Sequence, residues 1–92
     1  MEIVVVERTY AEALPAEVLL AAIEAHGADP CAGLRRVRHL RSMLSRDGLR
    51  LLCFYEAPDA ATVREASALE GAEHMEVWTA RVFEGVVAEP SG

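Results

Sequence analysis

The chain lacks most of the short motifs that would tie it to a known chemistry. It has no Gly-rich phosphate loop, no GxSxG motif and no calcium-loop acidic cluster, so nucleotide cofactors and serine hydrolysis are not expected. Its two cysteines, Cys31 and Cys53, form no CxxC pair, which argues against a zinc knuckle. HxH and HxxxH spacings are also missing. The sequence therefore predicts no dedicated metal site and no cofactor.

Long apolar runs and an excess of positive charge are missing as well. No run approaches the roughly 18 apolar residues of a membrane span, and Met1-Glu2 lacks the basic flank of a signal peptide. We therefore expect a cytoplasmic protein with free thiols and no membrane partner. Fifteen acidic residues against nine basic ones give a formal charge of -6, which argues against nucleic acid as a partner.

What the chain does have is the composition of one small folded unit. Its 92 residues are 52% hydrophobic and 26% charged, which excludes disorder and fits one domain. A core of this size is marginal, so dimerisation would be a natural source of further burial. We expect a single domain over residues 1–87 and a flexible tail over 88–92.

The order of predicted elements indicates an α+β fold. Glu2–Thr9 is a β-branched run typical of a buried strand. A helix follows Pro15, with Val18, Leu19, Ala22, Ile23 and His26 on an apolar stripe that Gly27 ends.

The second half of the chain adds a hairpin, a helix and a strand. Strands 36–45 and 49–56 flank Asp47-Gly48, which predicts a two-residue type I′ turn. Asp59 caps a helix that ends at Gly71, and His74–Val86 is a last strand. The order is βαββαβ, a ferredoxin-like sandwich with both helices on one face. We expect the bare face to pair two copies as a homodimer, a dimeric α+β barrel.

The hairpin turn predicts which side chains share a face. The set Leu40, Ser42, Leu44, Leu51, Cys53 and Tyr55 would pack under the helices. The set His39, Arg41, Met43, Leu52, Phe54 and Glu56 would lie on the bare face. A register slip of one residue would exchange the two sets.

Ionisable groups on an otherwise apolar face point to a ligand pocket closed by the dimer. His39, Arg41 and Glu56 are the candidate catalytic residues: an imidazole to move a proton, a carboxylate to orient it and a guanidinium to hold an enolate or carboxylate. The candidate binding residues are Glu7, Tyr10, Met43, Phe54, Tyr55 and Trp78. The alternative is a cross-strand salt bridge of Glu56 with Arg41 or His39, without chemistry.

The remaining candidates for metal ligation are isolated residues. His26 lies at a helix end, where an imidazolium interacts favourably with the helix dipole, and this explains it without a metal. His74 lies between acidic residues, where a loose surface site is conceivable. His39, His74 and Cys31 are therefore only weak metal candidates. Cys53 is expected to be a buried structural thiol.

Several stretches together resemble a known family. They are Val6–Tyr10, Leu40–Ser42, Cys53–Asp59, Val63–Glu65 and Val77-Trp78. On these residues the chain resembles the domain-of-unknown-function 4242 family, whose members include proteins of the nickel-binding type with a dimeric ferredoxin-like fold. Many members have a histidine where this chain has Arg41, and another where it has Ala66. Arginine cannot replace imidazole as a metal ligand.

Two hypotheses about function follow. The first is a small-molecule-binding dimeric α+β barrel, of the kind that includes cofactor-independent cyclases and isomerases acting on a hydrophobic carbonyl compound by acid/base chemistry. The alternative, implied by the resemblance, is a protein that binds nickel or another divalent transition metal. Its ligands would come from His39, His74, Glu56 or Cys31.

Overall fold

Two helices and four strands make up the part of the chain that the computed structural model describes, residues 1–28, 36–66 and 71–86. In chain order these are β1 (Glu2–Thr9), α1 (Ala16–Ala28), β2 (Arg38–Leu44), β3 (Arg50–Ala57), α3 (Ala60–Ala66) and β4 (His74–Ala80). The strands form one antiparallel sheet in the order β2-β3-β1-β4. The predicted ferredoxin-like βαββαβ fold is confirmed.

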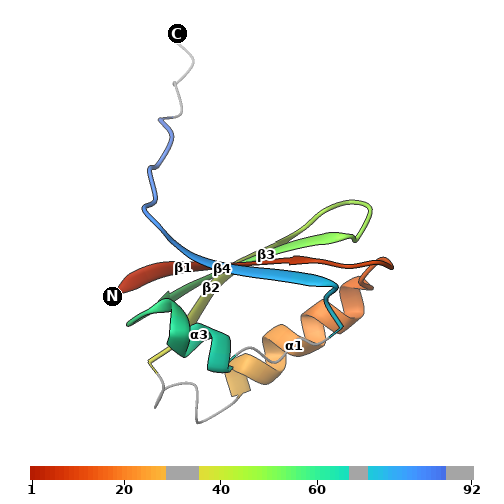
Figure 1. Cartoon of the computed structure of the whole chain (residues 1–92), viewed down its shortest axis with the longest axis horizontal. Coiled ribbons are helices and arrows are strands. Elements are labelled where there is room, and N and C mark those ends of the chain that lie inside the picture. Colours follow the sequence, from red (N-terminus) through yellow and green to blue (C-terminus); the bar gives the residue numbers. More distant parts are fainter. Residues whose placement is uncertain (29–35, 67–70, 87–92) are drawn as a thin grey trace, which may run out of the picture.

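Both helices lie on the same side of the sheet, and the opposite side carries none (Figure 1). We call these two sides the covered face and the helix-free face. The buried hydrophobic cluster lies between the sheet and the helices. Its members are Val4, Val6, Tyr10, Leu19, Val37, Leu51, Cys53, Ala57 and Val63. None of the helices in the described ranges is long and apolar enough to cross a membrane.

The central strand β1 owes its position to its β-branched sequence. Val4, Val5 and Val6 are all fully buried, although Val5 points to the helix-free face. Val5 lies between Phe54 on β3 and Trp78 on β4, and these two large side chains shield it. A run of valines suits such a strand because its side chains are buried on both sides.

The hairpin turn differs from the predicted type I′ turn. Glycines apart, Arg36 is the described residue with a positive φ, so Asp47 does not have the backbone that type I′ requires. The Gly48 N–H donates to the Ser45 carbonyl at 2.9 Å, and within the turn only Gly48 has a left-handed φ, of 74°. The Asp47 carboxylate accepts from Ser45 Oγ (2.6 Å) and from the Leu49 N–H (3.0 Å). Side-chain hydrogen bonds therefore hold a longer loop in place.

The register of the hairpin confirms the predicted faces from the turn back to Arg41. It contradicts the predicted faces for the residues of β2 that precede Arg41. Arg41 lies opposite Phe54, as expected. Leu40 was expected opposite Tyr55, but His39 occupies that place because a register shift falls between His39 and Arg41. A bulge inserts one extra residue into the strand, so the side chains before it point to the face opposite to the one predicted by simple alternation. His39 therefore lies on the covered face, and its predicted place on the bare face was wrong.

The last strand is shorter than predicted. β4 ends at Ala80, which pairs with Ile3 near the start of β1. Beyond this pair only Glu2 of β1 remains, so residues 81–86 leave the sheet as an extended segment. The segment rises on the helix-free side (Figure 1). The predicted tail, 88–92, and Cys31 lie outside the described residues.

Candidate functional site

Two histidines that lie far apart in the sequence meet on the covered face. His26 comes from the last turn of α1 and His39 from β2, with ring centroids 6.2 Å apart. Tyr55 on β3 completes the group, with its ring 5.9 Å from that of His26 and 5.4 Å from that of His39. All three pairs are edge-to-face, an arrangement that aromatic rings favour. We call these residues, together with Ser42 and Cys53, the histidine cluster.

A chain of polar contacts runs from His39 into the core. His39 Nε2 lies 2.8 Å from Ser42 Oγ, and Ser42 Oγ donates to Cys53 Sγ at 3.2 Å. Arg8, which is only 1% exposed, approaches the same sulfur with Nη1 at 3.9 Å. Cys53 is a buried free thiol, as expected from sequence. Buried polar atoms joined in this way hold one another in position.

Burial changes the protonation of the histidine cluster. Desolvation lowers the pKa of His39, and the charge of His26 lowers it further, while a hydrogen bond with the Arg41 backbone opposes both effects. Desolvation raises the pKa of Tyr55 to about 12, with Cys53 adding to the rise and Arg8 opposing it. Near neutral pH the cluster therefore presents a neutral imidazole at His39 and a protonated phenol.

The helix-free face carries a separate pocket of about 260 Å³. It is lined by Ile3, Leu40, Arg41, Met43, Phe54, Val82 and Glu84. The bulge explains why Leu40 and Arg41, neighbours in sequence, both reach it. The pocket is mostly apolar, with one guanidinium and one carboxylate among its lining groups, which suits an amphipathic organic compound.

The structure divides the predicted catalytic trio between the two faces. Arg41 lines the pocket, and Glu56 lies opposite Arg38 on β2 and Ile3 on β1. His39 is on the other side of the sheet, in contact with His26. The expected salt bridge of Glu56 with Arg41 or His39 is not formed among the described side chains. One protomer therefore does not assemble His39, Arg41 and Glu56 around one ligand.

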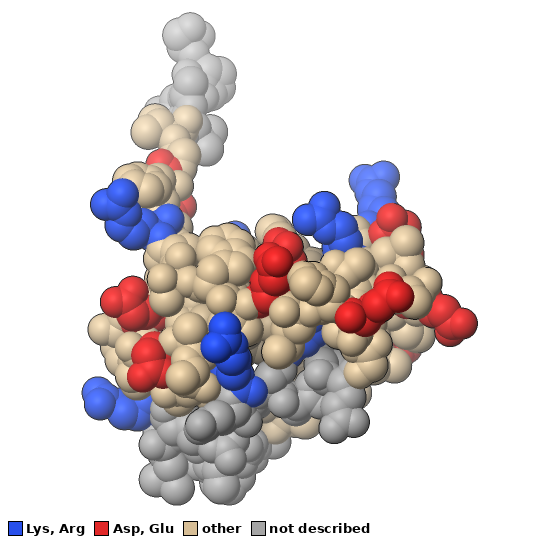
Figure 2. Space-filling view, in the orientation of Figure 1, with Lys and Arg blue, Asp and Glu red and all other residues tan. Residues whose placement is uncertain are grey.

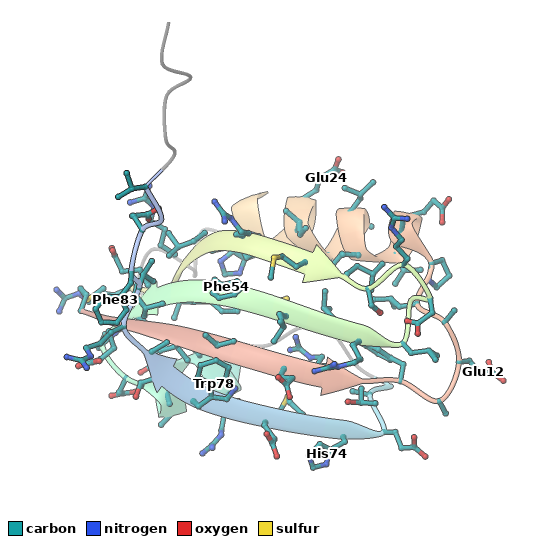
Figure 3. The ribbon with its side chains drawn as sticks, turned by 90° about the horizontal axis from the view of Figure 1, so that it is seen from above. Glu12, Glu24, Phe54, His74, Trp78 and Phe83 are labelled. Atoms are coloured by element: carbon teal, nitrogen blue, oxygen red, sulfur yellow. The ribbon has the colours of Figure 1, made fainter. Side chains whose placement is uncertain are left out.

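The predicted binding residues are divided in the same way. Met43 and Phe54 line the pocket. Trp78 lies on the helix-free face, separated from Phe54 by β1 (Figure 3), and Glu7 lies opposite Glu76 on that face. Tyr55 belongs to the histidine cluster. Tyr10 is buried in the core beneath the helices, away from the pocket.

The weak metal candidate His74 lies at the edge of the sheet. Its Nε2 is 3.2 Å from Glu76 Oε1, and both side chains are more than half exposed. Across the described residues no group of three or more histidines, cysteines and carboxylates is placed to hold one ion.

His26 is the residue that sequence reasoning explained too simply. Its place on the apolar stripe of α1, with Leu19 and Ile23, is the signal that it faces the sheet. The helix dipole explains a histidine at a helix end but does not require that it be near another imidazole. Only the bulge at Leu40 brings His39 beneath it.

The fold and the two sites define a small ferredoxin-like α+β domain with paired imidazoles under its helices and an apolar pocket on its bare face. The model of the nickel responsive protein SCO4226-like family matches residues 5–79, and the chain belongs to this family. This agrees with the family resemblance inferred from the sequence. No curated protein and no solved structure gives a significant match.

The histidine cluster fits a nickel ion in part. Imidazole nitrogen suits nickel. Two imidazoles that share an ion at about 2 Å each have centroids at most about 6 Å apart, so the edge-to-face rings of His26 and His39, 6.2 Å apart, must turn and move closer to share one. The bond of His39 to the Arg41 backbone orients its ring, as outer bonds do for metal-ligating histidines. Two imidazoles are fewer protein ligands than the four of a structural metal site. These residues therefore fit an ion that exchanges with solvent rather than one that is permanently bound.

Proposed function

We propose that this protein binds nickel reversibly and that His26 and His39 are its imidazole ligands. The observation that carries the proposal is the convergence of these two side chains, 6.2 Å apart, in a chain of the nickel responsive family. The ion is a cargo or a signal rather than a resident cofactor, because the pair leaves most coordination positions to water.

The protonation of the cluster supports this role. A metal competes with protons for a ring nitrogen, so a histidine with a lowered pKa remains available at lower pH. His39 has such a pKa because it is desolvated beneath α1 and lies next to His26. Ser42 Oγ, which lies 2.8 Å from His39 Nε2, is the group that an ion would replace at that nitrogen.

The proposal is tested by titrating nickel into protein purified without a metal-affinity column, and measuring heat by calorimetry. We expect binding to the wild-type chain and at least tenfold weaker binding for His26→Gln and for His39→Gln. The matched control is His74→Gln, which removes an exposed imidazole at the edge of the sheet. The control should bind as the wild type does.

Two outcomes would reject the assignment. Equal affinity in all four proteins would place the ion elsewhere, and loss of binding only in the His74→Gln variant would place it at the edge of β4. Circular dichroism of each variant would show that the fold is intact, so that lost binding is not lost structure.

A second candidate function rests on the pocket of the helix-free face. Its apolar lining and Arg41 favour a hydrophobic compound with an acidic group, held by the guanidinium. At about 260 Å³ the pocket is slightly smaller than the usual range for ligand sites. A partner chain that closes it would enlarge it, as expected for the predicted homodimer. Binding alone is proposed here, because none of the described residues that line the pocket is a histidine able to carry out acid/base catalysis beside Arg41.

Native mass spectrometry tests this second function. Protein purified without added metal would carry an organic mass that is lost in Arg41→Met. Arg46→Met, a change in the hairpin loop, is the control and should keep the mass. Wild-type protein that carries no such mass, and binds no amphipathic carboxylate added to it, would remove this candidate.

A further inference from the structure

Residues 81–86, which we call the C-terminal arm, expose apolar side chains to an unusual degree. Phe83 is 81% exposed and Val86 97% exposed, although each has a large apolar surface. The arm leaves the end of β4 and projects from the helix-free side of the sheet (Figure 1). Figure 3 shows Phe83 at this end of the sheet. Exposed apolar side chains grouped in this way mark a contact surface.

The arm has two sides with different surroundings. Successive side chains of an extended segment point in opposite directions. Val82 and Glu84 line the pocket against the sheet of their own chain. Arg81 and Phe83 are on the other side, where the Arg81 guanidinium lies 5.5 Å from the centre of the Phe83 ring. The Phe83 ring is therefore directed away from its own sheet.

The helix-free face carries apolar surface that could receive such a ring. Leu40, Met43 and Trp78 are between 42% and 48% exposed there. Trp78 covers the buried Val5, so the middle of the face is apolar and continuous across the central strands. This is the composition expected for the centre of a contact between proteins, where aromatic residues and methionine are enriched.

Charge also matches between the arm and the face. Glu7 and Glu76 lie directly opposite each other on β1 and β4, and like charges in this position are unfavourable. The arm carries Arg81 next to Phe83. An arm laid on the face can bring this guanidinium to the acidic pair while the ring covers the apolar centre.

We propose that the C-terminal arm of each chain packs on the helix-free face of a second copy, with Phe83 against the partner's Trp78. Six extended residues reach about 20 Å, and four strands spaced about 4.8 Å apart cover a shorter distance. The arm is therefore long enough to cross the partner's sheet. Each pocket is then bounded by two chains, with Val82 and Glu84 of its own arm on one side and the partner's sheet on the other.

This exchange of arms is independent of nickel binding, because the histidine cluster lies on the covered face. An isotope-filtered nuclear Overhauser experiment on a mixture of labelled and unlabelled full-length protein tests it directly. We expect contacts between the Phe83 ring of one chain and the Trp78 indole of the other. Contacts only within one chain would overturn the proposal, since the arm would then fold on its own face.

Sedimentation provides the matched energetic test. The wild-type chain should sediment as a dimer, and Phe83→Asp should weaken the dimer at least tenfold. Leu20→Asp is the control, because it places the same acid at a similarly exposed apolar position on α1. This control should sediment as the wild type does. A monomeric wild-type chain, or a dimer that Phe83→Asp leaves unchanged, would contradict the proposal.

Discussion

The two faces of the sheet differ in how their apolar residues are covered. On the covered face, Val4, Val6 and Leu51 are completely buried beneath helices of the same chain. On the helix-free face, Val5 alone among the described side chains is completely buried, by its strand neighbours, while Met43 and Trp78 stay nearly half exposed. A face that is covered within the chain stabilises the monomer, whereas the other can gain burial only through a partner.

The same division separates the chemistry. The covered face holds the paired imidazoles in a desolvated setting, and the helix-free face holds Arg41 in an apolar pocket. A cation suits the first site, whereas the second, with Arg41 and Glu84 among its lining residues, suits an amphipathic compound. The charged residues elsewhere are intermixed, and Figure 2 shows acidic and basic side chains interspersed over the side in view. The difference teaches that one small sheet can present two separate binding environments.

The largest effect should come from removing a leucine from the covered face. Leu51→Ala should lower the free energy of unfolding by about 2–5 kcal/mol, because it leaves a cavity in the core. Leu52→Ala, one residue along on the helix-free face, should cost only about 1 kcal/mol in dilute solution. Urea unfolding measures both, and equal losses would show that the faces do not differ.

A smaller effect should come from loosening one of the covering helices. Asp59 Oδ1 accepts from the Thr62 N–H at 2.8 Å and from Thr62 Oγ1 at 2.7 Å at the start of α3. Asp59→Ala should therefore cost about 1 kcal/mol, measured by thermal unfolding. Asp59→Ser can still cap the helix and should recover most of that loss. If Asp59→Ser does not recover the stability, loss of the helix cap is not the cause of the destabilisation in Asp59→Ala.

In alkali the covered face should lose stability through Tyr55. Its folded-state pKa is raised from 10.0 to about 12. The unfolded chain therefore releases this proton first, so the stability is fully present below pH 10 and is lost as the pH rises from 10 to about 12. Denaturant unfolding over this range should show a shallower loss for Tyr55→Phe. An unchanged slope would mean that the phenol is not buried as described.

The smallest effect is expected in mild acid. The pKa of His39 is lowered from 6.5, so the unfolded chain takes up this proton more readily than the folded chain. Stability is then highest above pH 6.5 and falls as the pH drops through the folded-state pKa. His39→Gln should flatten this fall between pH 7 and pH 5 in urea titrations. A steeper fall in the variant would reverse the sign of the argument.

The sequence predicted the element order and most of the hairpin register from local signals. Asp47-Gly48 and the alternation around it are sufficient to pair Leu44 with Leu51 and Ser42 with Cys53. The turn type was wrong because the Ser45 hydroxyl and the Asp47 carboxylate hold a longer loop, which a dipeptide rule does not include.

Other errors came from contacts between distant parts of the chain. The end of β4 at Ala80 is fixed by the start of β1, not by its own sequence, in which Val82 and Phe83 still favour a strand. The meeting of His26 and His39 needed both the helix position and the bulge. The family is defined by the chain as a whole, and it indicated nickel more directly than any single residue did.

The bulge at Leu40 has a consequence for how relatives of this protein are compared. Two residues from one strand, His39 and Arg41, lie on opposite sides of the sheet, although simple alternation would place them on the same side. A relative with the same bulge and a histidine at the position of Arg41 would present that imidazole on the side away from α1. In a sequence alignment, the columns of His39 and Arg41 would then describe two different sites, although they are only two positions apart. The absence of a histidine from one column would therefore leave the capacity of the other untouched.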